Sequence, residues 1–215
     1  RLDADNSFKC VKYNEIVRHF ANTYGVKTII LVARFPLYLL GERYNNGEGG
    51  IESGRPVLVD LADKLNFDKT TTYLTRIERV AERYRSDIEL LARDFNVVVF
   101  SPTPEVGWDV PSYYGKKMLL QSSSNDIIDV SHSYDNYRNR NIKFNEILKS
   151  IDSKNLYIYD MHKLFCNRDS GRCLANSGEN LLYSDNDHLS SFGANMVAQD
   201  FIQFYENQVT TSSNE

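Results

Sequence analysis

The apolar residues of this chain follow two periods that alternate along the sequence. In some segments they recur every three or four residues, which places them on one face of an α-helix. Between these segments lie short runs that are almost continuously apolar, as in strands buried on both faces of a parallel sheet. The helical segments cover residues 13–24, 73–95, 141–151 and 194–205, and the strand-like runs cover 26–33, 97–100 and 156–159. This alternation predicts an α/β sandwich with a mostly parallel sheet.

Two long segments interrupt the alternation, residues 35–69 after the first strand and residues 101–132 after the second. Both exceed the length of an ordinary connection between a strand and a helix. Because both leave the carboxyl ends of strands, they lie at the edge where open α/β sheets bind their ligands. They are about equally consistent with surface loops and with the walls of a substrate cleft.

Length, composition and charge limit the class of protein. A chain of 215 residues with 41% hydrophobic residues is typical of a single globular domain, which we place at residues 1–208, with a disordered tail at 209–215. No apolar run approaches the roughly 20 residues that a bilayer requires. The net charge of −4 argues against a nucleic-acid partner. Three strands are few for such a domain, so we expect its first strand to lie upstream of Arg1.

The three cysteines bear on the cellular compartment. Cys166 and Cys173 enclose a short polar loop and lack the two-residue spacing of a zinc or redox motif. We therefore expect a disulfide bond between them, which would place the domain in an oxidising compartment. Two reduced thiols in a cytosolic loop are the alternative. With the disulfide formed, Cys10 has no partner in this chain.

One short segment carries the residue types of general acid–base chemistry. Asp185 and His188 are separated by two residues and come directly before the last helical segment, for which Ser190 or Ser191 is the capping residue. A carboxylate beside an imidazole holds the ring in one tautomer and stabilises the imidazolium that forms during proton transfer. The Asp-x-x-His spacing is common by itself. The Leu-Ser-x-x-Gly sequence that opens the helix makes the catalytic interpretation much stronger.

The segment 185–194, Asp-Asn-Asp-His-Leu-Ser-Ser-Phe-Gly-Ala, resembles the last signature block of the SGNH/GDSL hydrolase superfamily. More narrowly, the chain resembles the SGNH domains fused to acyltransferase family 3 membrane proteins. The other parts that carry the resemblance, which together cover most of residues 8–205, are the strand 27–34, the loop between Cys166 and Cys173, and the helix with Tyr137, Arg138 and Asn145. The resemblance implies a three-layer α/β/α sandwich of flavodoxin-like type.

The family implies a periplasmic domain of an inner-membrane protein that helps to move acyl groups, usually acetyl, onto bacterial surface polysaccharides such as lipopolysaccharide O-antigen. A membrane-bound acyltransferase domain of the same protein would handle the acyl donor, which we expect to be acetyl-CoA. The expected partners are thus this membrane domain and a surface glycan, and we expect the chain itself to bind no cofactor and no metal. A carbohydrate esterase, which passes the acyl group to water, and a non-catalytic glycan-binding domain are the alternatives.

The resemblance also assigns roles to individual residues. His188 would be the general base that takes a proton from a serine hydroxyl, and Asp185 would be the carboxylate that orients it. Asp187 also neighbours the histidine, and we expect it to be an exposed companion. Structural or surface roles are expected for the other histidines, which are His19, His132 and His162.

The sequence departs from the family pattern at the nucleophile. That serine normally follows the first strand in a Gly-Asp-Ser block, which this chain lacks, and neither Ser53 nor Ser170 follows a buried strand. We therefore expect the serine to lie on a strand upstream of Arg1, together with a cysteine that pairs with Cys10. A degenerate domain that has lost its nucleophile is the alternative.

Further candidates for contacts with the substrate lie near the ends of the strands. Arg34 follows the first strand and is a candidate for stabilising an oxyanion or holding an anionic group, with a structural salt bridge as the competing role. Tyrosine and tryptophan rings suit sugars because they have flat apolar faces and polar edges. Most of the 14 tyrosines fall in helical stripes or strands. The aromatic residues in the long segments, which are candidates for glycan contacts, are Tyr38, Trp108, Tyr113 and Tyr114.

Overall fold

The computed structural model describes residues 4–60, 73–120 and 128–210. The features predicted from the sequence that lie outside the described residues are 61–69 and 121–127 of the long segments, 211–215 of the tail, and the side chain of Cys10. Among the helices that the structure describes, none is long and apolar enough to cross a bilayer.

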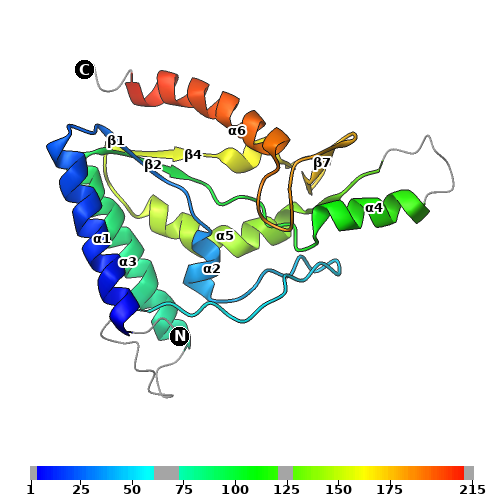
Figure 1. The fold of residues 1–215 in the computed structure, drawn as a ribbon, viewed down its shortest axis with the longest axis horizontal. Coiled ribbons are helices and arrows are strands. Elements are labelled where there is room, and N and C mark those ends of the chain that lie inside the picture. Colours follow the sequence, from blue (N-terminus) through cyan, green and yellow to red (C-terminus); the bar gives the residue numbers. More distant parts are fainter. Residues whose placement is uncertain (1–3, 61–72, 121–127, 211–215) are drawn as a thin grey trace.

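A parallel sheet lies at the centre of the structure (Figure 1). Its strands are β1 (Thr28–Leu31), β2 (Asn96–Phe100) and β4 (Leu156–Tyr159), in the spatial order β1–β2–β4. Ile30 of β1 lies opposite Val98 of β2, which in turn lies opposite Tyr157 of β4. The sheet confirms the three strands that the apolar runs predict.

Helices cover both faces of this sheet. α3 (Tyr73–Asp94) and α5 (Tyr134–Lys149) lie on one face, and α6 (Ser191–Phe204) lies on the other (Figure 1). Successive side chains of β2 point to opposite sides, so Val97 packs into the core beneath α3 and α5 while Val98 packs into the core beneath α6. The three-layer α/β/α architecture is therefore the one that was predicted.

The outer edge of the sheet at β1 is open. Within the described residues β1 pairs with β2 alone, and Ile30 and Val32 are exposed beside this edge. The first helix, α1 (Ala4–Thr23), is joined to α3 by an ion pair between Arg18 and Asp94. The exposed members of its predicted apolar stripe are Tyr13, Ile16, Val17, Phe20 and Tyr24. The described part of the chain thus leaves apolar side chains of α1 and of the β1 edge uncovered.

Some helices are additional to the predicted ones or longer than them. α2 (Phe35–Leu40) directly follows the first strand, and α4 (Val110–Leu120) lies in the second long segment. α5 begins well before the predicted segment 141–151, because Ser133 Oγ caps it by accepting a hydrogen bond from the Asn136 amide at 3.2 Å. The early turns of α5 carry mostly polar residues, so apolar periodicity does not reveal them.

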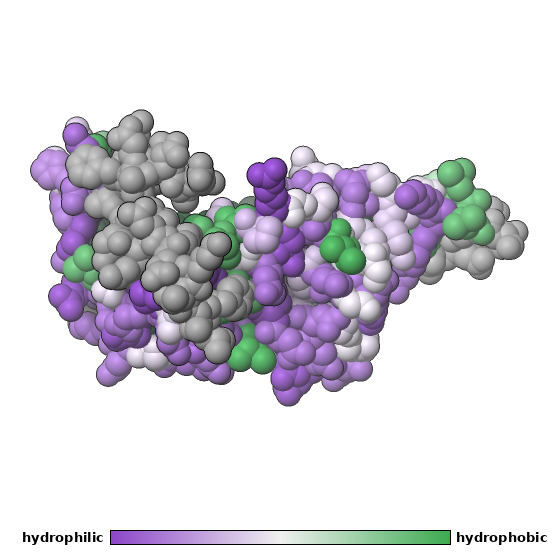
Figure 2. All heavy atoms as spheres, turned by 90° about the horizontal axis from the view of Figure 1, so that it is seen from below, coloured by the Kyte–Doolittle hydropathy of each residue, from purple (hydrophilic) through white to green (hydrophobic). Residues whose placement is uncertain are grey.

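The face of the molecule seen in Figure 2 is mostly hydrophilic. A hydrophobic patch lies at one end of it, where α4 ends and Met118, Leu119 and Leu120 are exposed. This end of α4 borders residues that the structure does not describe.

Short antiparallel strands and one 3₁₀ turn lie between the larger elements. They are β3 (Ser131–Ser133), η2 (Met161–Leu164), β5 (Cys166–Asn167), β6 (Arg172–Leu174), β7 (Asn176–Ser177) and β8 (Asn180–Leu181). Cys166 and Cys173 lie opposite each other on β5 and β6, and their sulfur atoms are bonded. This confirms the predicted disulfide.

The chain remains ordered beyond the predicted end of the domain. After α6 it continues as a π-helical segment, η3 (Tyr205–Thr210), and Val209 is 1% exposed in the core beneath α6. The structure thus includes Val209 and Thr210 in this helical segment, whereas the sequence predicts a disordered tail from residue 209. The physical reason is that burial of the apolar Val209 side chain is favourable even though the residues around it in the sequence are polar.

Candidate active site

The two catalytic candidates lie on a short loop between β8 and α6, and the loop is closed at its neck. The Ser184 amide donates a hydrogen bond to the His188 carbonyl, and the Ser190 amide donates one to the Leu182 carbonyl, both at 2.9 Å. Ser190 also caps α6, since its Oγ accepts a hydrogen bond from the Gly193 amide at 3.1 Å. A Cβ at Gly193 would lie 2.3 Å from the Leu182 carbonyl oxygen, so this position requires glycine. The Leu-Ser-x-x-Gly sequence therefore holds the loop against the helix.

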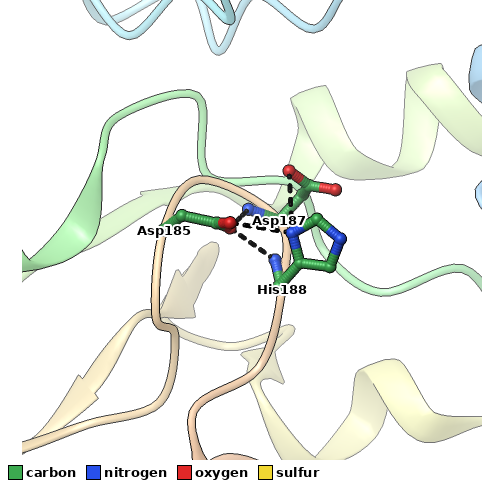
Figure 3. A group of neighbouring side chains, drawn as sticks. All are labelled: Asp185, Asp187 and His188. Atoms are coloured by element: carbon green, nitrogen blue, oxygen red, sulfur yellow. Dashed lines mark hydrogen bonds and ion pairs between the residues drawn. The ribbon is translucent and has the colours of Figure 1, made fainter.

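The Asp185 carboxylate holds both the backbone and the side chain of His188 (Figure 3). Its Oδ1 accepts hydrogen bonds from the amides of Asp187 and His188 at 2.9 and 2.7 Å, and its Oδ2 lies 2.8 Å from His188 Nδ1. With Nδ1 donating to the carboxylate, Nε2 is left to accept a proton from another group. The imidazole is 72% exposed, and Nε2 meets no hydrogen-bond partner in the part of the chain that the structure describes. This is the geometry of a general base and its orienting carboxylate.

The surrounding charges favour a protonated ring. The hydrogen bond to Asp185, followed by the charge of Asp187, raises the pKa of His188 above its usual value. Burial opposes the ionisation of Asp185, but the hydrogen bonds from the backbone and ring of its neighbours outweigh it and lower the pKa of this carboxyl group. The pair is thus suited to stabilise an imidazolium, which is what a histidine base becomes when it takes a proton.

Asp187 is not the exposed companion that the sequence suggests. Its side chain is only 7% exposed; Oδ2 lies 3.1 Å from Arg34 Nη1, and Oδ1 lies 3.7 Å from His188 Nδ1. Burial raises the pKa of Asp187, against the opposing charges of Arg34 and His188. The expectation is wrong because the contact with Arg34 turns this carboxylate into the protein, while Asp185 stays at the surface.

The three polar side chains of the loop also meet the distance criterion of a cation site. Potential ligand atoms of Asp185, Asp187 and His188 lie within 4.8 Å of one another. However, Asp187 is already paired with Arg34, and His188 Nδ1 is already bonded to Asp185. The side chains are therefore already joined to one another and to Arg34 by one hydrogen bond and by ion pairs.

Arg34 connects the end of β1 to three carboxylates. Its guanidinium donates to Glu52 at 3.0 and 2.8 Å, forms a close ion pair with Glu105, and contacts Asp187. Glu105 is also paired with Arg140 of α5 at 3.0 Å. Burial disfavours the charged guanidinium, but these carboxylates outweigh it and raise the pKa of Arg34 above its usual value. Such contacts favour the structural salt bridge over the oxyanion role, because the positive charge is already shared among protein carboxylates.

The sequence pattern does not reveal the partners of Arg34. Glu52 lies in the first long segment and Arg140 on a polar stretch of helix, where charged residues are expected to face solvent. Glu105 offers the only signal, since it follows β2 in the segment that leaves the carboxyl edge of the sheet.

The loop lies at the carboxyl edge of the sheet, as predicted. Val106 and Val110 both lie in the second long segment, which follows β2. Their amides donate hydrogen bonds to the carbonyls of Asn186 and Asp185 at 2.9 and 3.2 Å. Arg34 pairs with both Asp187 of the loop and Glu52 of the first long segment, so both long segments reach the site. The described parts of the long segments therefore contribute to its walls.

The four aromatic candidates do not gather in one place. Trp108 and Tyr113 line one pocket, described below. Tyr114 packs against the core beneath α6, and Tyr38 lies on α2 at the surface. The structure therefore brings two of these four residues together.

The remaining histidines occupy different environments. His19 is exposed on α1, whereas His132 is fully buried, and burial lowers the pKa of His132 to about 4. His162 is partly buried, with Nδ1 3.3 Å from the Ser101 hydroxyl, which also accepts a hydrogen bond from the His162 amide at 3.2 Å. Ser101 is 4% exposed, so this contact is enclosed in the protein. These environments match structural or surface roles.

The fold and the loop define an α/β domain with an Asp–His pair directly before its last helix. A family model described as the SGNH domain fused to AT3 domains matches residues 1–203, and the chain therefore belongs to this family. A solved structure with which it shares 13% sequence identity is the periplasmic domain of a lipopolysaccharide acetyltransferase from Salmonella ser. Paratyphi A. The TM-score is 0.42; the match covers 66% of this chain and 50%, about half, of that one. No curated protein matches the chain.

Proposed function

We propose that this domain transfers an acyl group, usually acetyl, to a hydroxyl group of a bacterial surface polysaccharide such as lipopolysaccharide O-antigen. The mechanism would use a Ser-His-Asp triad whose serine lies outside this chain. The observation that carries the proposal is the 2.8 Å contact between Asp185 Oδ2 and His188 Nδ1, on a loop that leaves the ring exposed. Membership of a family defined by fusion to AT3 domains supports it.

The pair can perform both halves of an acyl transfer. In the first half, His188 Nε2 removes the proton of the serine hydroxyl as the serine oxygen attacks the acyl carbonyl, and the imidazolium then protonates the leaving group of the donor. In the second half, His188 takes the proton of the glycan hydroxyl, whose oxygen attacks the acyl-serine, and returns a proton to the serine oxygen. Asp185 remains ionised in both halves, holds the ring tautomer and stabilises the imidazolium.

The open edge of β1 supports placing the serine on a strand outside this chain. An exposed strand edge with apolar side chains beside it is a surface that folded domains usually protect or cover. A further parallel strand beside β1 would satisfy the backbone groups of this edge and cover Ile30 and Val32, which are exposed in the described structure. The carboxyl end of that strand would lie at the same sheet edge as the Asp185–His188 loop. The proposed triad needs its serine at this edge, within reach of His188.

The proposal extends to the compartment and the partners. We place the domain in the periplasm as part of an inner-membrane protein, whose AT3 domain would handle the acyl donor, acetyl-CoA. The disulfide between Cys166 and Cys173 supports an oxidising compartment. The proton transfers assigned to His188 and Asp185 require no cofactor on this domain.

A carbohydrate esterase is the second candidate, because water can attack an acyl-serine with the help of the same two side chains. The exposure of His188 favours this candidate, since a ring that is 72% exposed gives water access to the site. The acetyl content of the glycan separates the two activities. Loss of a transferase lowers the O-acetyl content, whereas loss of an esterase raises it.

The test uses His188→Ala and Asp185→Ala in the full-length parent protein, with His19→Ala as the matched control. We expect His188→Ala to abolish O-acetylation of the surface glycan and Asp185→Ala to reduce its rate by roughly 10²- to 10⁴-fold. His19 is an exposed histidine of α1, and its replacement should leave acetylation unchanged. Wild-type acetylation by His188→Ala at equal expression would reject the catalytic assignment.

A further inference from the structure

A pocket of about 660 Å³ is lined by α4, by the strands β3 and β6, and by the segments that carry Glu48 and Trp108. We call it the Trp108–Tyr113 pocket; its lining residues are Glu48, Trp108, Tyr113, Lys117, Leu120, Ile128, Asp129, Ser131 and Arg172. Its volume lies in the range of about 300–1,000 Å³ that is usual for small-molecule sites. The mechanism proposed above uses none of these residues.

Two aromatic side chains of this pocket lie against each other. The rings of Trp108 and Tyr113 are stacked, with centroids 4.4 Å apart and planes inclined by 10°. Both side chains are only partly buried, and Lys117 Nζ lies 5.3 Å from the Tyr113 ring. Flat rings with polar edges complement the C–H faces and the hydroxyl groups of a sugar.

The rim of the pocket is polar but electrically balanced. The Arg172 guanidinium forms two hydrogen bonds with the Glu48 carboxylate, at 2.6 and 2.8 Å, and also donates to the Ser131 carbonyl at 2.7 Å. Lys117 and Asp129 add one further charge of each sign to the lining. Paired planar groups of this kind bind hydroxyl groups through their remaining donor and acceptor positions. A balanced rim favours an uncharged sugar over a strongly anionic one.

The pocket is rigidly attached to the catalytic loop. Trp108 lies between Val106 and Val110, whose amides are bonded to the loop carbonyls of Asn186 and Asp185. A ligand held on Trp108 is therefore held next to the loop that carries His188. The segment that bears Trp108 is thus shared between the pocket and the catalytic loop.

A second set of contacts holds Trp108 in place. The buried Asn46 side chain donates a hydrogen bond to the Val106 carbonyl at 2.8 Å. Gly107, with φ of 82°, approaches Gly50 so closely that a Cβ there would lie 2.7 Å from the Gly50 carbonyl oxygen. The ring surface is thus formed before any ligand arrives, which lowers the entropic cost of binding.

We propose that the Trp108–Tyr113 pocket binds an uncharged sugar residue of the acceptor glycan and so presents a neighbouring residue of that glycan to His188. This inference rests on the proposed function for the identity of the glycan. Sugar binding in the pocket is itself independent of catalysis.

Trp108 is the only tryptophan of the chain, so its fluorescence reports on this pocket alone. The experiment titrates the 215-residue chain with oligosaccharides prepared from the surface polysaccharide of the source cells after mild base has removed the acetyl groups. We expect a saturable change in the emission of Trp108. Calorimetry should show that Tyr113→Ala and Glu48→Gln each bind about 5- to 10-fold more weakly.

Tyr24→Ala is the matched control, because Tyr24 is an exposed tyrosine outside the pocket. This variant should bind the oligosaccharide with the affinity of the wild type. Circular dichroism checks that each variant is folded, and Glu48→Gln keeps the test valid if Tyr113→Ala does not fold. Unchanged Trp108 emission together with wild-type affinity of Glu48→Gln would overturn the pocket assignment. If instead the pocket variants bind weakly while His188→Ala acetylates normally, the sugar site stands and the catalytic assignment fails.

Discussion

Arg34 Nη1 lies 3.1 Å from Asp187 Oδ2, which joins the end of the first strand to the loop that carries His188. The same guanidinium binds Glu52 and Glu105, which are also paired with Arg43 and Arg140, so it joins carboxylates from three separate segments. All three carboxylates have side chains less than a tenth exposed. Removing the cation would leave the buried Asp187 carboxylate without its arginine, while Glu52 and Glu105 would keep only Arg43 and Arg140.

This relationship predicts a large effect of Arg34→Met, which keeps the length of the side chain and removes its charge. We expect a loss of about 2–3 kcal/mol in the free energy of unfolding, somewhat less than for a fully buried pair because a quarter of the Arg34 side chain is exposed (25%). Urea unfolding measures this loss. The control is Arg138→Gln, since Arg138 forms an exposed pair with Asp135 and should cost at most about 0.5 kcal/mol. Equal losses for the two variants would contradict the structural role of Arg34.

The pKa of His188 shows which of its two acidic neighbours, Asp185 or Asp187, stabilises the protonated ring more. NMR titration of the ring should give a pKa above the ordinary value of 6.5. Asp185→Asn should lower this pKa more than Asp187→Asn, because Asp185 is hydrogen-bonded to the ring while Asp187 acts through its charge from 3.7 Å. The opposite order would assign the orienting role to Asp187.

The pH dependence of acyl transfer follows from the same shift. A general base acts only when neutral, so the rate should fall as the pH drops through the raised pKa of His188, above 6.5, and should level off at higher pH. Asp185→Asn should move this fall to lower pH and also lower the plateau, because the ring loses both its charge partner and its tautomer control. The measurement is the initial rate of O-acetylation by the full-length parent across pH 5–9. If Asp185→Asn leaves the pH dependence of the rate unchanged, Asp185 does not set the pKa of the catalytic base.

The disulfide should contribute to stability by restricting the unfolded chain. Cys166 and Cys173 are separated by 7 positions, and closing so short a loop is worth roughly 2–3 kcal/mol in the chain-entropy model. Thermal unfolding of Cys166→Ala/Cys173→Ala should therefore show a lower midpoint that reducing agent does not change. Wild-type protein should fall toward the same midpoint when reduced. An unchanged wild-type midpoint under full reduction would show that the bond carries no stability.

The 215-residue chain by itself should show no appreciable turnover of an acetyl ester. It contains the proposed base and its carboxylate, but the described residues place no serine or cysteine side chain against His188 Nε2. Loss of a triad nucleophile removes covalent catalysis and leaves only the weak effect of the rest of the site. Hydrolysis of p-nitrophenyl acetate, compared with His188→Ala, measures this. Turnover that depends on His188 would place a nucleophile within the chain.

The sequence alone was enough to predict features that depend on residues close together in the chain. Apolar spacing reports which face of a local segment is buried, and it located the three strands, α1, α3 and α6. The Asp185–His188 contact was also predictable, because both residues belong to one turn of a loop whose backbone the Asp185 side chain itself holds. The disulfide joins two strands of one short hairpin and is local in the same sense.

Contacts between distant segments were decided only by the tertiary structure. Trp108 and Tyr113 form a pocket with Glu48 and Arg172 because separate parts of the chain meet there, and no spacing in the sequence relates the four. The tertiary structure also decides which aspartate of the loop is buried, Asp187, and which stays at the surface beside His188, Asp185. A carboxylate is buried only where a cation balances it. For Asp187 that cation is Arg34, which stands at the end of a strand far away in the sequence and reaches the loop only when the chain is folded.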